Sequence, residues 1–432
     1  MMKHRIILWF FFAFAATVSA QPVTLDSCRR WSKANYPLIQ QYQLVSQSEA
    51  YSVSNAARAW LPQVRFSAQA TWQTDAARYP EEMNDMLAVM GVEIDGIRQD
   101  QYKIALDISQ NIWDGGRSRA DKDIAQAQAE ADRLAVDVDF YTLESRVDNL
   151  YFGILLLEGQ KTQNRHRLEL LEENRRRCQV LAENDMLLQS DLDAVEVEII
   201  TVNQRNDQIN SSCEAYRQML SLMTGRNLST AELATPPDVE TFHETSLQQN
   251  NRPELQLLDA RIDLLTAQQK MVKVASMPQF SLFAQAWYGY PGLNMFENMQ
   301  NAKWSLNAIV GARMQWNIGA YYTQGNRLNQ LRNTQQQLKV QREVFNFNNQ
   351  LEQSQENGEI GRLQRALQDD ERIVQLRRSV REAGERKHDN GIISTSELLQ
   401  LIGDESVAQS ALILHQIELL KKQYEYKHTI NL

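Results

Sequence analysis

Apolar residues recur along much of the chain at alternating spacings of four and three residues, the spacing of a coiled-coil seam. The first such run comprises Val136, Phe140, Leu143, Val147, Leu150, Ile154 and Leu157. The seam breaks at 184–190, resumes at Leu192 and continues to Met223. These patterns predict helices over about 117–183 and 191–224, joined by a tight turn.

The prolines leave room for such long helices. All nine lie within residues 22–80 and 236–291, so that 81–235 and 292–432 contain none. Because a proline costs about 3 kcal/mol in a helix interior, the two proline-free tracts can each hold long helices.

The second tract predicts a similar hairpin, with one helix over about 320–387 and another ending near 428. The seam of its last helix is formed by Leu398, Leu401, Ala408, Leu412 and Leu419. Three glycines interrupt the helix before it, and each costs up to about 1 kcal/mol relative to alanine. We therefore expect local bending or unwinding at Gly358, Gly361 and Gly384.

Four shorter segments have the alternating pattern of β-strands and carry aromatic residues. They span about 62–74, 102–113, 279–290 and 304–317. Strands of about 9–11 residues with aromatic ends suit a membrane barrel, although a soluble hairpin with buried aromatics fits the same pattern. Because the smallest membrane barrels have about eight strands, a barrel would need several copies of the chain, and three copies are the simplest solution.

The sequence contains an internal duplication. Pro37 and Pro62 stand as far apart as Pro253 and Pro278, and each second proline opens a similar strand segment. Matching strand-to-helix junctions and hairpin turns follow in the same order. This duplication predicts two structural repeats, over 21–235 and 236–432.

The N-terminus has the pattern of a secretory signal peptide over residues 1–20. Lys3 and Arg5 precede an almost wholly apolar run, which ends in small residues at Ala20. Removal of this segment would make the net charge of −9 two units more negative. An acidic, exported chain is a poor match for nucleic acid, so no nucleic-acid partner is expected.

The turns carry recognisable local signals. Ser394 and Glu397 have the spacing of a capping box at the start of the last helix, and Ser190 with Asp193 forms a weaker version. Gly391 suits the left-handed residue that ends the preceding helix. The strand-to-helix junctions carry Gly115, Gly116 and Gly319.

Candidate catalytic chemistry is missing from the sequence. The three cysteines have neither a disulfide-framework pattern nor a metal-ligand spacing, and the six histidines are scattered. We find no nucleophile, dinucleotide or zinc-protease motif. The sequence therefore predicts a protein that is not an enzyme and that uses no cofactor or metal.

Taken together, these blocks resemble the TolC family of outer-membrane efflux proteins over nearly the whole exported chain. The resemblance rests on Asn35-Tyr-Pro37 and Asn251-Arg-Pro253, on the two strand entries, on Asp114-Gly-Gly-Arg117 and on the two hairpin turns. It implies a mainly α-helical homotrimer, with a 12-stranded β-barrel in outer-membrane lipid and a helical coiled-coil barrel across the periplasm.

The resemblance also implies partners and a function. Such channels are passive exit ducts of tripartite efflux pumps or type I secretion systems in Gram-negative bacteria. They work with a periplasmic adaptor (membrane fusion) protein and an inner-membrane pump of the RND, ABC or MFS type. An alternative that remains open is a periplasmic coiled-coil scaffold or adaptor without a pore.

By the same resemblance, the functional site is the periplasmic tip. The gate or lumen ring would comprise Glu397, Gln400, Asp191 and His388. Adaptor docking would use Asn184, Met186, Leu187 and Ser190 in the first turn and Gly391, Ile392, Ile393 and Ser394 in the second. Gln400 and Ile393 depart from the residues that the family often has there, so the usual double acidic ring and latch are not expected.

Overall fold

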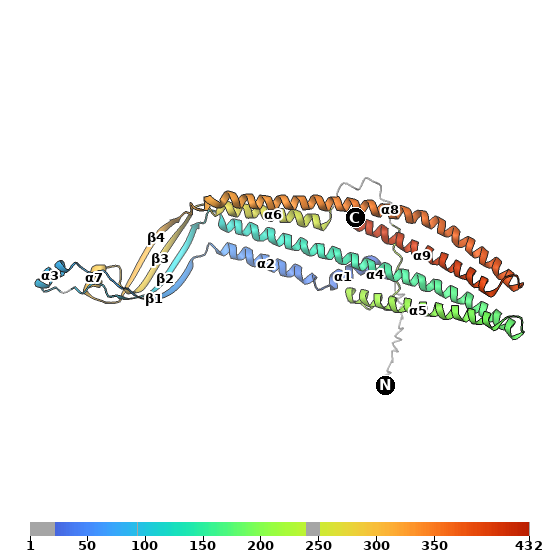
Figure 1. The fold of residues 1–432 in the computed structure, drawn as a ribbon. Helices are drawn as coiled ribbons and strands as arrows, with labels where there is room; N and C mark the ends of the chain where they lie inside the picture. Colours follow the sequence, from blue (N-terminus) through green and yellow to red (C-terminus); the bar gives the residue numbers. More distant parts are fainter. Residues whose placement is uncertain (1–21, 93, 239–250, 432) are drawn as a thin grey trace, which may run out of the picture. The chain divides into compact units, whose positions relative to one another are not determined.

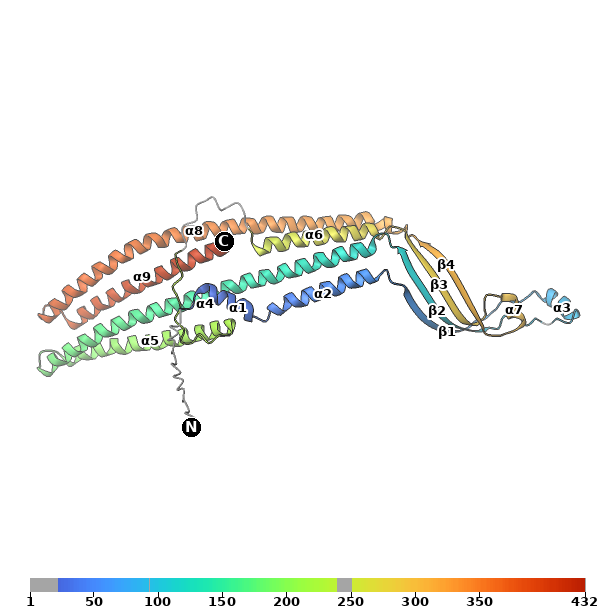
Figure 2. The ribbon, with the colours of Figure 1, turned by 180° about the vertical axis from the view of Figure 1, so that it is seen from behind.

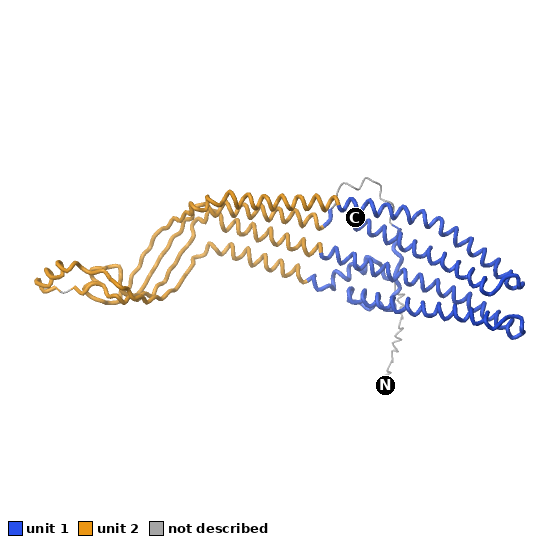
Figure 3. The backbone as a smooth tube through the Cα atoms, in the orientation of Figure 1, with its two compact units in different colours: residues 1–39, 139–252, 348–432 blue, residues 40–138, 253–347 orange. Residues whose placement is uncertain are grey.

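A computed structural model describes residues 22–92, 94–238 and 251–431. The expected signal peptide at 1–20 lies outside this described part. The chain forms two compact units, one from residues 1–39, 139–252 and 348–432, the other from 40–138 and 253–347 (Figure 3). Each unit combines segments of both predicted repeats, and the division of the sequence into those repeats stays a prediction.

Two long helical hairpins dominate the helical structure. The first joins α4 (Arg117–Glu183) to α5 (Gln189–Thr224), and the second joins α8 (Ala320–Asp389) to α9 (Thr395–Ile430). The seam residues Val136, Phe140 and Val147 are buried, as the spacing of four and three predicts. The ends of both hairpins, including their turns, lie in the first unit.

The unwinding expected at the glycines of α8 is not found, because α8 is one unbroken helix from Ala320 to Asp389. Gly384 instead allows a close approach between α8 and α9. A Cβ atom at this position would stand 2.3 Å from Cδ1 of Leu401. The packing of α8 on α9 therefore favours glycine at this position.

A short helix, α1 (Leu25–Asn35), packs on α5 in the first unit. Thr24 caps it, with its side chain accepting from the Ser27 amide. The fully buried Cys28 and Tyr151 belong to the core beneath it. The Tyr151 hydroxyl donates to the carbonyl oxygens of Val23 and Ala234, which ties two distant segments to α4.

The second unit contains α2 (Ile39–Arg58), α6 (Pro253–Val274) and a four-stranded antiparallel sheet. The strands β1 (Gln63–Trp72), β2 (Asp100–Trp113), β3 (Gln279–Tyr290) and β4 (Ser305–Gln315) lie side by side in this order (Figures 1 and 2). Two short helices, α3 (Glu81–Val89) and α7 (Met295–Gln300), interrupt the β1–β2 and β3–β4 connections. The sheet leaves β1 and β4 as open edges.

The register of the sheet gathers apolar side chains on one face. Val64, Ile108, Ala284 and Val310 form one cross-strand row, and Phe66, Leu106, Ala286 and Ala308 form the next. Much of this face is exposed in the single chain, with Phe66 at 71% and Val310 at 79%. An exposed apolar face of this length is typical of strands that contact lipid.

The opposite face is mainly polar. Asp107 lies across from Arg65 on β1 and from Gln285 on β3. The Gln285 amide donates to Asp107, and Lys103 donates to Gln285 at 3.1 Å. The Lys103 ammonium also stands over the Trp287 ring at 4.7 Å. This alternation of apolar and polar faces matches strands with lipid on one side and water on the other.

The strand-to-helix junctions differ in what they require. Gly115 has a φ of +69°, and a Cβ atom there would stand 2.7 Å from Cβ of Met277. Both the left-handed backbone and the close approach therefore favour glycine. Neither reason applies at Gly319. A Cβ atom there would contact only Oδ1 of Asn317, at an ordinary distance of 3.5 Å.

None of the helices in the described part of the chain is long and apolar enough to cross a membrane.

Candidate functional site: the helical hairpin tips

The two hairpin turns have the same local geometry. Asn184 and Asn390 each donate a side-chain hydrogen bond to the carbonyl oxygen four residues earlier, at 2.7 and 2.6 Å. The next residues, Asp185 and Gly391, both have left-handed backbone, with φ of 56° and 70°. The left-handed end predicted at Gly391 is therefore confirmed, while the equivalent role of Asp185 was not foreseen.

The starts of the following helices are not alike. At α9, Ser394 and Glu397 form the complete capping box that the sequence predicts. At α5 the corresponding prediction is wrong, because the helix starts at Gln189 and its cap, Leu188, makes no side-chain bond. Ser190 therefore lies inside the first turn of α5 and not at its cap.

The tips share one apolar core. Leu171 and Cys178 of α4, Val195 and Ile199 of α5 and Leu398 and Ile402 of α9 form its buried part. Burial raises the pKa of the Cys178 thiol, which fits a small apolar core residue. The two hairpins are therefore packed together at their tips within one chain.

The apolar residues of the turns divide into two groups. Leu187 and Ile393 pack against the tip core, so they support the turns from inside. Met186 and Ile392 are exposed at 72% and 68%. Leu188, which the sequence did not single out, is equally exposed at 72%. The exposed group alone offers an apolar surface to a partner.

The four residues expected in a gate ring are placed differently from one another. Glu397 and Gln400 are exposed, and Asp191 is half-buried. His388 is buried within its own hairpin, where its Nε2 lies 3.2 Å from the Thr395 hydroxyl. The structure therefore brings His388 to Thr395 and not to Asp191.

Charged groups join α8 to α9 behind the tip. Glu405 is 3% exposed and Arg381 is 8% exposed, and the Nε of Arg381 donates to Glu405. Arg381 also bonds Glu385, at 2.5 Å, and Arg378 approaches Glu405 at 3.4 Å. Burial lowers the pKa of Arg381, but its bonds to Glu405 and Glu385 outweigh that and raise it. The sequence did not reveal this buried cluster.

Metal chemistry has no support at the tips or elsewhere in the described ranges, where no group of three or more histidine, cysteine or acidic residues could hold an ion.

Comparisons with known proteins agree with this architecture. Residues 31–179 match the family model described as outer membrane efflux protein. The outer membrane protein VceC of Vibrio cholerae superposes with a TM-score of 0.71 at 14% identity, over 94% of this chain and 95% of that one. The Campylobacter jejuni CmeC outer membrane channel gives a TM-score of 0.68 at 13% identity, over 94% and 85%. No curated protein matches the chain in sequence.

The chain has the fold of the TolC-like outer membrane channels, and residues 31–179 match the outer membrane efflux protein family. The open state of the Neisseria gonorrhoeae MtrE outer membrane channel is also similar, with a TM-score of 0.65 at 14% identity, over 94% and 88%. These similar proteins are named as outer membrane proteins or channels. The predicted fold class is confirmed, and the similar proteins are channels and not enzymes.

Proposed function

We propose that three copies of this chain form an efflux channel through the outer membrane, with four strands from each copy closing a 12-stranded barrel. The observation that carries the proposal is the sheet in the second unit, with one apolar face, one polar face and open edges at β1 and β4. Open edges favour pairing with another chain. Because the strand order is β1 to β4 without crossing, β4 of one copy can pair antiparallel with β1 of the next.

The helices support the same assembly. On α8, exposed apolar side chains recur at spacings of four, three and four residues, at Val340, Val344, Phe347 and Leu351. This is the spacing of a coiled-coil seam, and these four positions are left exposed by the described residues 22–92, 94–238 and 251–431. We infer that neighbouring copies of the chain cover these positions in a helical barrel.

We further propose that the channel is the exit duct of a tripartite efflux pump or type I secretion system. An inner-membrane pump would supply the energy, and a periplasmic adaptor would dock at the two tips. The proposed docking surface is the exposed group Met186, Leu188 and Ile392, framed by Asn184, Ser190, Gly391 and Ser394. Leu187 and Ile393, although expected at this surface from the sequence, would act by supporting it.

The gate is proposed at the same end. A threefold axis would bring three copies of Glu397 together in an acidic ring. The negative charge of this ring would attract cations and repel anions. Glu397 already accepts a bond from the Ser394 amide at 2.9 Å, and a capping carboxylate can also face a lumen. Gln400 would line the next position, Asp191 would lie beside it, and His388 would stabilise the turn through Thr395.

Charges placed on the exposed tip residues should abolish export without loss of the trimer. Met186→Asp and Ile392→Asp put a carboxylate on a surface that we expect to be covered by apolar adaptor residues, whereas they remove little from the tip core. We expect export in a strain that lacks the chromosomal copy to fall to the level of the empty strain, measured with a panel of efflux substrates.

Two controls separate docking from folding. Leu187→Asp and Ile393→Asp should lower the amount of folded protein, because both side chains pack against the tip core. Met90→Asp, at an exposed position outside the tips, should export normally. Normal export by Met186→Asp and Ile392→Asp would contradict docking at this surface.

A further inference from the structure

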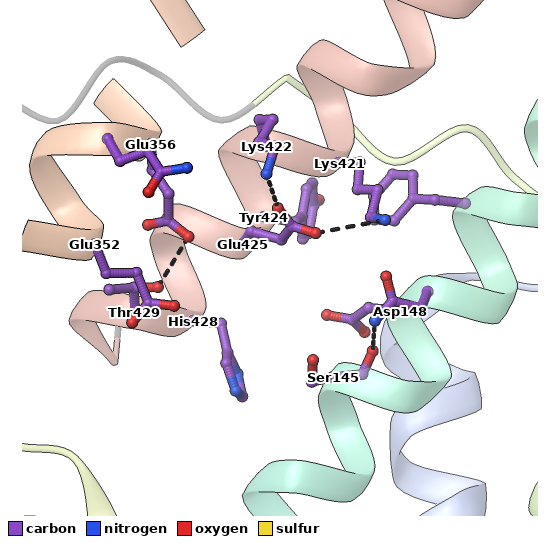
Figure 4. A pocket seen from close by; sticks show the side chains of 13 residues that line it. Ser145, Asp148, Glu352, Glu356, Lys421, Lys422, Tyr424, Glu425, His428 and Thr429 are labelled. Carbon is purple, nitrogen blue, oxygen red and sulfur yellow. Dashed lines mark hydrogen bonds and ion pairs between the residues drawn. The ribbon is translucent and has the colours of Figure 1, made fainter. Parts of the chain in front are cut away.

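A cavity of about 310 Å³ opens between α4, α8 and α9 within the first unit (Figure 4). It is remote in sequence from the hairpin turns and belongs to none of the sites described above. Its volume is at the lower end of the range of small-molecule sites. Its polar lining includes Asp148, Glu352, Glu356, Lys421, Lys422 and Glu425.

Most of these charges are already paired. Asp148 accepts from Arg29 at 2.8 Å, and Glu425 bonds Lys422 at 2.6 Å and approaches Lys421 at 3.5 Å. Glu352 lies 3.9 Å from Arg252. The acidic groups are therefore largely neutralised by cations that belong to the same unit.

Glu356 is the exception. It is only 7% exposed, and one of its carboxylate oxygens accepts a bond from the Thr429 hydroxyl at 3.1 Å, as the dashed line in Figure 4 shows. The other oxygen, Oε2, is buried and has no hydrogen-bond partner. Leaving a buried carboxylate oxygen unpaired costs free energy, so a ligand that donates to it would be favoured.

We propose that this cavity binds a small organic cation, a protonated primary amine, whose ammonium group pairs with the Glu356 carboxylate. A metal ion fits less well, because the described residues offer no group of three ligands for one. Phe152 and Tyr424 also line the cavity and offer aromatic surface to the alkyl part of such a ligand. The proposal is independent of the tip surface and of the cargo that the channel carries.

The proposed site should respond to pH. The pKa of Glu356 is raised to about 7, mainly by burial and also by the nearby Glu352 and Glu425, while Thr429 and Lys422 oppose the rise. The other charged or titratable groups at the cavity are Asp148 on α4 and Lys421, Tyr424 and His428 on α9. Since the ionised carboxylate is the form that attracts an ammonium group, binding should strengthen as pH rises through 7 and should release a proton.

Calorimetry on the purified, detergent-solubilised protein tests the proposal with butylamine as the probe and butanol as the uncharged control. Butylamine stays protonated at pH 6 and pH 8, as a lysine side chain does. With a pKa near 7 for Glu356, the ionised fraction rises about tenfold between these pH values, so the affinity should rise about tenfold. Butanol should give no saturable heat.

Glu356→Gln provides the decisive variant, because it keeps the shape of the side chain but removes its charge. It should weaken butylamine binding at pH 8 by about tenfold or more and abolish the pH dependence. Glu359→Gln is the matched control, since Glu359 is on the same helix, has a side chain that is 41% exposed and pairs with Arg362 at 2.9 Å. It should bind like the unchanged protein.

Two results would overturn the proposal. One is the absence of saturable butylamine heat at either pH in the unchanged protein, which needs no variant to fold. The other is equal binding by the unchanged protein and by Glu356→Gln, which would place any amine elsewhere.

Discussion

Arg381→Ala is expected to destabilise the first unit by about 3–5 kcal/mol, because it would remove the closest cation from a buried carboxylate. Glu405 is only 3% exposed, and its contacts to arginine come from Arg381 and, at 3.4 Å, from the more exposed Arg378. The change should appear as a large fall in the melting temperature of the detergent-solubilised protein, followed by circular dichroism.

The neighbouring arginine offers a matched control. Arg377 pairs with Asp404 at 2.7 Å, but both side chains are more than a third exposed. Arg377→Ala should therefore cost less than about 1 kcal/mol. Removing both charges in Arg381→Met with Glu405→Leu should recover much of the loss, because no buried charge then stays unpaired. Equal effects of Arg377→Ala and Arg381→Ala would contradict the assignment of a buried ion pair.

Phe66→Arg should remove most of the assembled protein from the outer membrane. Phe66 lies on the apolar face of the sheet, across from Leu106, and an arginine in contact with the lipid interior costs about 2–4 kcal/mol at mid-membrane depth. In a trimer, each of the three chains would add this free-energy cost. The measurement is the amount of trimer in purified outer membranes, determined on unheated samples.

Ser67→Arg is the control for the face of the strand. Ser67 is the next residue of β1 and points to the opposite face, where Arg65 and Gln69 already lie. We expect trimer levels close to those of the unchanged protein. If the two variants accumulate equally, the apolar face does not contact lipid.

Much of the fold was accessible from the sequence because its signals are local and repeated. The spacing of four and three residues marks the helices, and the Asn184 and Asn390 turns end two of them in the same way. The strand segment at 279–290 corresponds to β3, Gln279–Tyr290. Periodicity is sufficient here, since each element presents one continuous face to its neighbours.

The tip residues were harder to assign, because a helical period ends where a turn begins. Nothing in the sequence distinguishes Met186, which is exposed, from Leu187, which packs inward. The ring of buried His388 meets Thr395 across the turn, and the tip core joins α4, α5 and α9. Such contacts between distant segments have no local signature.

The buried charges were missed for a related reason. Other charged residues lie close in the sequence to Glu356, Arg381 and Glu405. Such a pattern is typical of a solvated helix face. Only the packing of α8 on α9 shows that these groups are buried. The same packing opens the cavity around Glu356.

The mass of the particle that detergent extracts from purified outer membranes tests the central claim most directly. We predict a particle of three chains that separates into single chains on heating. A single chain or a dimer, released from the periplasm without detergent, would contradict the channel and favour a soluble coiled-coil scaffold.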